Sequence, residues 1–163
     1  MKYIYYFLML TFILETSKNV SAQGTTCADA DPFCTGTTYS FPNNTGTSAQ
    51  AGPDYGCLLS QPNPAWYYLQ IDQSGTIQMD ISQVNASGSG IDVDFIAYGP
   101  FGSAAGGCGS LTSGNTVDCS YSSSANETAT IIGAVSGEYY ILLITNFSNQ
   151  PGNVSFSQTG GTG

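Results

Sequence analysis

The stretch EYYILLIT, residues 138–145, is apolar at almost every position after its first residue. It is eight residues long, it is rich in aromatic and β-branched side chains, and Ser136 and Gly137 precede it as turn signals. A short, continuously apolar run of this kind is typical of a strand whose two faces are both buried. We therefore expect residues 138–145 to form a central strand of a β-sheet.

Two other stretches alternate between apolar and polar residues, which is the period of a half-buried strand. Residues 76–81 place Ile77, Met79 and Ile81 on one side, and residues 91–98 (IDVDFIAY) repeat the pattern. No window of eleven or more residues shows the period of a helix. Both stretches are therefore predicted to be strands with one face on a core.

Glycine and proline divide the remaining chain into short strand-like runs, at 37–41, 65–72, 128–133 and 153–158. Turn signals at 74–75 and 135–137 predict two hairpins, one joining 65–72 to 76–81 and one joining 128–133 to 138–145. Short strands at this spacing are typical of an all-β sandwich. We predict a disulfide-stapled, antiparallel, jelly-roll-like β-sandwich of seven or eight strands.

The N-terminal segment 1–22 has the layout of a secretory signal peptide: a lysine, an apolar run of about a dozen residues, and small residues at the end. A retained N-terminal anchor is the alternative interpretation. After the leader we expect a lead-in segment at 23–36, the sandwich at 37–158, and a Gly/Thr linker-like tail at 159–163. The protein is thus predicted to be secreted, with no transmembrane anchor once the leader is removed.

The charge of the chain excludes many functions. Its 163 residues include 2 Lys+Arg, 11 Asp+Glu and no His, and both basic residues, Lys2 and Lys18, lie in the leader. Nucleic-acid binding needs cations that neutralise phosphates, so we expect no nucleic-acid partner. Catalytic triads and histidine-based zinc sites need an imidazole. The composition favours a binding or structural module over an enzyme.

An exported chain with five cysteines is expected to contain disulfides. Local context favours one bridge between Cys108 and Cys119, which bracket a Gly/Ser/Thr-rich stretch, and a second between Cys34 and Cys57. Cys27 is then left unpaired or available for an intermolecular bond.

Asp92 and Asp94 stand two apart in a predicted strand, so their carboxylates leave the same face. No side-chain cation can separate them, and Ca²⁺ is the natural substitute because it binds oxygen ligands. Asp118, Glu127 and Asp80 would complete a calcium site if the fold brings them close. The alternatives are two solvated carboxylates, or the acid and base of a glycosidase.

Trp66 and Tyr68 share one face of the predicted strand 65–72, and Tyr67 takes the other. An exposed aromatic pair could stack on sugar rings, which makes Trp66 and Tyr68 candidate ligand-binding residues. Buried core packing is the alternative.

Several stretches together resemble the N-terminal β-sandwich module of large secreted surface proteins of Bacteroidetes, which are adhesin-like or gliding-associated and use type IX secretion. The stretches that carry the resemblance are ADPFCTGTTYSFP (30–42), AGPDYGCLLSQPNPAWYYLQI (51–71), IDVDFIAYGPF (91–101), NTVDCSYS (115–122) and GEYYILLITNFSNQPGNVSFSQTGGTG (137–163). The strand IDVDFIAYG is also similar to jelly-roll domains of the CUB and pre-peptidase C-terminal kind, some of which bind calcium.

The resemblance implies extracellular placement, disulfides and no catalysis. We therefore expect a secreted, non-catalytic cell-surface module that serves adhesion or builds an extracellular structure, with an extracellular protein, a glycan or a second copy of itself as partner. A carbohydrate-binding module of a secreted protein is the alternative.

Overall fold

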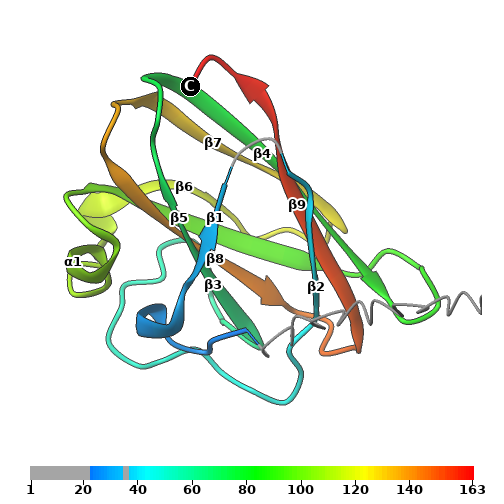
Figure 1. The fold of residues 1–163 in the computed structure, drawn as a ribbon. Helices are drawn as coiled ribbons and strands as arrows, with labels where there is room; N and C mark the ends of the chain where they lie inside the picture. The colour runs from blue at the N-terminus through cyan, green and yellow to red at the C-terminus, as the bar shows by residue number, and fades with distance from the viewer. Residues whose placement is uncertain (1–22, 35–36) are drawn as a thin grey trace, which may run out of the picture.

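The computed structural model describes residues 23–34 and 37–163, which form two β-sheets packed face to face (Figure 1). The predicted leader, 1–22, lies outside the described residues. The elements in chain order are η1 (Cys27–Asp29), β1 (Asp31–Phe33), β2 (Tyr39–Pro42), β3 (Pro64–Gln70), β4 (Gly75–Asn85), β5 (Val93–Phe101), α1 (Ala104–Cys108), η2 (Ser113–Asn115), β6 (Thr116–Ser120), β7 (Asn126–Ala134), β8 (Tyr139–Asn146) and β9 (Gly152–Gly161).

One sheet has five strands in the order β1-β3-β8-β5-β6, and the other has four in the order β2-β9-β4-β7. Apart from β1, which runs parallel to β3, all paired strands are antiparallel. The apolar run 138–145 becomes β8, which pairs with β3 on one side and β5 on the other, so its predicted central position is confirmed. The predicted all-β sandwich is therefore confirmed.

The main core lies between the sheets and follows the alternation of the sequence. The apolar side of β4 meets the apolar side of β5 there, and both sides are fully buried. Tyr67 and Phe156 form the aromatic centre of this core, with ring centroids 4.5 Å apart.

A second apolar cluster covers the outer face of the five-stranded sheet. It contains Trp66 of β3, Ile96 and Tyr98 of β5, and Leu58 from the long loop between β2 and β3. The Tyr98 hydroxyl donates to the carbonyl of Asp54 at 2.7 Å, which ties this loop to the sheet. The five-stranded sheet is consequently buried on both faces, as the apolar composition of β8 requires.

Helix α1 is part of the same cover and lies close to the sheet. A Cβ atom on Gly107 would come within 2.6 Å of the Phe101 ring and 2.7 Å of Ile141. Glycine at this position therefore allows the close approach.

The two predicted hairpins are wrong. The turn at 74–75 connects β3 of the five-stranded sheet to β4 of the four-stranded sheet, and the turn at 135–137 connects β7 to β8 across the sandwich in the same way. Each turn reverses the chain but also changes the sheet, because both flanking strands direct apolar residues into the shared core from opposite sides.

The ends of the sandwich are longer than predicted. The lead-in 23–36 contains η1 and β1, and β1 pairs with β3. Most of the predicted tail 159–163 belongs to a strand and is not a linker. Strand β9 continues to Gly161, which lies opposite Ile77 of β4. With β1 and β6, which the sequence pattern did not predict, the described residues form nine strands.

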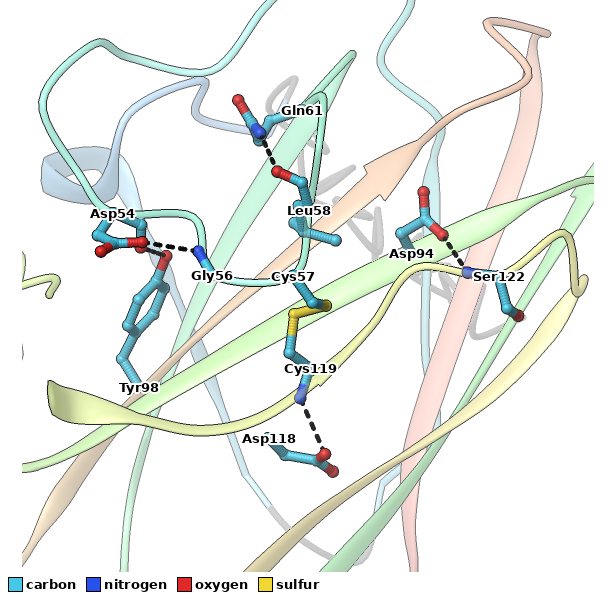
Figure 2. Close-up of a disulfide and its surroundings, with 10 residues drawn as sticks. All are labelled: Asp54, Gly56, Cys57, Leu58, Gln61, Asp94, Tyr98, Asp118, Cys119 and Ser122. Atoms are coloured by element: carbon cyan, nitrogen blue, oxygen red, sulfur yellow. Dashed lines mark hydrogen bonds between the residues drawn. A yellow bond between two sulfur atoms is a disulfide. The ribbon is translucent and has the colours of Figure 1, made fainter. Parts of the chain in front are cut away.

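The predicted disulfide pairing is also wrong. Cys27 is bonded to Cys108, and Cys57 is bonded to Cys119 (Figure 2), with sequence separations of 81 and 62 residues. Cys34, and not Cys27, is the free cysteine among the described residues, and it is exposed. The first bridge joins η1 to α1 within the outer cover, and the second fastens the long loop to β6 of the five-stranded sheet.

Candidate functional site

A small acidic pocket lies at the start of β5. It has a volume of about 190 Å³ and is lined by Asp92, Asp94, Tyr121, Ser122, Ser123 and Phe147. Asp92 directly precedes β5 and Asp94 lies in it, the next three residues come from the loop after β6, and Phe147 directly follows β8. The structure therefore brings together Asp92 and Asp94, as their spacing predicts.

Asp94 is buried, with 1% of its surface exposed. One carboxylate oxygen, Oδ1, accepts a hydrogen bond from the Ser122 amide at 3.0 Å (Figure 2). Its Oδ2 is buried and has no hydrogen-bond partner within the described part of the chain, and the same holds for Oδ1 of Asp92. Two buried carboxylate oxygens are thus unsatisfied at one place, which is costly in a folded protein.

The electrostatics of the pocket oppose ionisation. Burial raises the pKa of Asp94 to about 7, and the negative charges of Asp92 and Glu127 act in the same direction, while the Ser122 amide lowers the pKa. Burial, with a contribution from Glu127, also raises the pKa of Asp92. Residues 23–163 contain no Lys, Arg or His, so no side-chain cation offsets these effects.

The other carboxylates of the predicted calcium site are placed differently. Glu127 stands beside the pocket and accepts a hydrogen bond from the Ser122 hydroxyl. Asp80 is engaged on the four-stranded sheet, where its Oδ1 accepts from the Thr128 hydroxyl at 2.8 Å. Among the described residues, no three or more His, Cys, Asp or Glu side chains gather closely enough to hold a metal ion. The predicted four-carboxylate site is therefore not formed.

Asp118 has a structural role instead of the predicted calcium-binding one. From β6 in one sheet, its Oδ2 accepts a hydrogen bond from the Thr130 amide of β7 in the other sheet at 2.6 Å. Its Oδ1 accepts from the Cys119 amide at 2.8 Å (Figure 2). Asp118 thus joins the two sheets at one edge. It also accepts the hydrogen bond of a backbone N–H group that would otherwise be unpaired on the edge strand β7.

Replacing Asp118 by asparagine should lower the free energy of unfolding by about 1–2 kcal/mol. The amide keeps one acceptor oxygen and sets an NH₂ group against the second backbone N–H, so one charge-assisted hydrogen bond is lost. Urea denaturation measures the change. Asp72→Asn, which removes a carboxylate from an exposed position, is the matched control and should alter stability by less than about 0.5 kcal/mol. Equal effects of the two substitutions would contradict the structural role of Asp118.

The predicted aromatic ligand site does not form. Trp66 has 0% of its surface exposed, and its Nε1 donates to the carbonyl of Thr25 at 3.2 Å. Its indole packs against Tyr55 of the long loop, with ring centroids 6.3 Å apart. Tyr68 is half-buried beside the Cys27–Cys108 bridge. Both side chains therefore lie on the outer face of the sheet, beneath its cover. Trp66 cannot stack on a sugar in this conformation.

The outer face of the four-stranded sheet, which no other described segment covers, was not predicted as a site from the sequence. On the outer side of the four-stranded sheet, polar side chains alternate with the core residues; they include Ser40, Gln78, Asp80, Thr128 and Ser157. Asp80 lies opposite Thr128 on β7 and opposite Ser157 on β9. The alternation in 76–81 was the available signal, because it leaves Gln78 and Asp80 on the solvent side.

Comparisons with known proteins found distant structural similarity and no relative in sequence. No known protein family and no curated protein sequence matches the chain. One similar solved structure is the pre-peptidase C-terminal domain of a collagenase from Bacillus anthracis, with 12% identity and a TM-score of 0.49 over 80% of this chain and 94% of that chain. A second is the Podospora anserina GH26-CBM35 β-(1,4)-mannanase, with 8% identity and a TM-score of 0.33. This chain covers 28% of the mannanase, and the match includes 76% of this chain.

Proposed function

We propose that the chain is a secreted, non-catalytic β-sandwich module that acts at the cell surface, in adhesion or as a component of an extracellular structure. Its two disulfides indicate an oxidising environment. None of the helices in 23–34 and 37–163 is long and apolar enough to cross a membrane. The lack of any cationic or imidazole side chain in residues 23–163 supports the non-catalytic part of the proposal, because most acid–base and nucleophilic mechanisms depend on such groups.

The observation that carries the proposal is the contrast between the two sheets. The five-stranded sheet is covered on its outer side by the long loop, η1 and α1, and disulfides hold this cover in place. The four-stranded sheet leaves a broad, hydroxyl-rich face in solvent, with Ile132 exposed at 82% on its edge strand. We infer that this open face contacts an extracellular protein, a glycan or a second copy of the chain, and that the covered sheet provides rigid support.

The test has two parts. Fractionation of the producing cells should place the disulfide-bonded protein at the cell surface or in the medium, and recovery in the cytosol with reduced cysteines would refute the proposal. Binding of the purified protein to cells that lack it should then fall at least tenfold in the double variant Gln78→Arg/Thr128→Arg, which adds bulk and charge to the open face. The control variant Thr45→Arg/Ser110→Arg adds the same charge at exposed loop positions and should bind as the unmodified protein does. Equal binding by both variants would exclude the open face.

A further inference from the structure

We propose that the acidic pocket at the start of β5 binds Ca²⁺ weakly, with Asp92 Oδ1 and Asp94 Oδ2 as its protein ligands. These two oxygens are buried, they line one pocket, and neither has a hydrogen-bond partner within the described residues. Asp94 Oδ1 is already engaged by the Ser122 amide. This bond fixes the orientation of the carboxylate and leaves Oδ2 available to an ion. The site is separate from the open face that the proposed function uses.

The negative charge of the pocket has to be neutralised by a proton or by a cation from solution. No Lys, Arg or His exists in residues 23–163, so the chain itself supplies no positive side chain. Asp92 and Asp94 repel each other, and Glu127 beside them adds to the negative potential. One buried oxygen of each carboxylate has no internal partner, which favours an ion that reaches them from outside.

The chemistry of the pocket fits Ca²⁺ better than a transition metal. The available donors are carboxylate oxygens, with serine and tyrosine hydroxyls at the walls and no nitrogen or sulfur ligand. Hard cations prefer oxygen ligands, and Ca²⁺ accepts an irregular shell of six to eight that includes water. A volume of about 190 Å³ leaves room for several water molecules on the ion.

The number of carboxylates sets the expected affinity. Because only two carboxylates reach the pocket, and no group of three or more metal-binding side chains exists among the described residues, the affinity should fall in the range of extracellular modules, with Kd on the order of 0.1–1 mM. Such a site is filled outside the cell, where calcium is in the millimolar range.

The first experiment measures the melting temperature of the disulfide-bonded protein. In buffer of constant ionic strength, about 10 mM CaCl₂ should raise Tm by roughly 3–6 °C relative to a chelator. Asp94→Asn keeps the shape of the side chain and an acceptor for the Ser122 amide, so the variant should fold and lose the shift. The control Asp72→Asn should keep it. Absence of a shift in the unmodified protein, or an equal shift in Asp94→Asn, would overturn the proposal.

The second experiment locates the ion. Terbium occupies calcium sites and emits when a nearby tyrosine is excited, and Tyr121 lines the pocket. Emission excited through tyrosine should be removed by excess calcium and by Asp94→Asn. In Tyr121→Phe the emission should fall severalfold while the calcium-induced Tm shift remains. Undiminished emission in Tyr121→Phe or in Asp94→Asn would place the ion elsewhere and overturn the assignment.

Discussion

Replacing Cys57 and Cys119 together by alanine will lower the free energy of unfolding by about 4 kcal/mol. This bridge closes a loop in which the partners are 62 residues apart, and the chain-entropy relation gives about 4 kcal/mol for a loop of that length. The loss should be visible in urea denaturation under non-reducing conditions. Much of the expected effect comes from the unfolded chain, which gains freedom when the bridge is absent.

Cys34→Ala is the matched control for this experiment, since it removes an exposed thiol that forms no disulfide. We expect its effect to be below about 0.5 kcal/mol. The control also separates the observed pairing from the one that the sequence suggested, in which Cys34 is bonded to Cys57. A loss of several kcal/mol in Cys34→Ala would contradict the structure and restore that earlier pairing.

Trp66→Ala is expected to lower the free energy of unfolding by about 4 kcal/mol. The indole is fully buried under the long loop, and truncation of such a side chain leaves a cavity in addition to the lost transfer free energy. Its Nε1 hydrogen bond to the Thr25 carbonyl is lost as well. Thermal and chemical denaturation of the variant would measure the effect.

Trp66→Phe serves as the conservative comparison, because it retains most of the apolar contact and loses only the hydrogen bond and part of the volume. We expect it to cost about 1–2 kcal/mol. If Trp66→Ala kept its stability and instead abolished binding to a glycan, the indole would be an exposed ligand platform, and the carbohydrate-binding interpretation would be correct.

The strands and their faces could be predicted because alternation and continuous apolar runs report burial directly. Residues 138–145 form the central strand β8, and Tyr67 and Trp66 lie on opposite faces of β3, as their spacing requires. The short strand β1 gave no signal, because it has three residues and its pairing with β3 comes from the tertiary fold.

The pairing of strands and cysteines could not be predicted from local patterns. A turn signal shows that the chain reverses, but it does not show whether the next strand joins the same sheet or the opposite one. The sequence suggested bridges between cysteines that flank loops, whereas the observed bridges join segments 62 and 81 residues apart. Only the three-dimensional fold brings those segments together.

Half of the candidate calcium site could be predicted. Asp92 and Asp94 line one pocket, as their two-residue spacing indicates, because near neighbours in an extended segment point to the same side. The position of Asp118 relative to them depends on which strand of the other sheet lies next to β6. That strand is β7, where the Asp118 carboxylate accepts a hydrogen bond from the amide of Thr130. No periodicity in the sequence carries that information.

The Cys27–Cys108 bridge limits how far the domain can extend under mechanical load. If force is applied at Gln23 and Gly163, the bridge lies only four residues from Gln23. The force is then transmitted through the disulfide to Cys108, and the segment between the two cysteines is not extended. Even after complete unfolding, the chain would lengthen to about 200 Å at roughly 3.5 Å per residue. The length would be about 280 Å if only the Cys57–Cys119 bridge remained, and about 500 Å with neither bridge. The described part of the protein can therefore reach less than half of its full contour length while both bridges are intact.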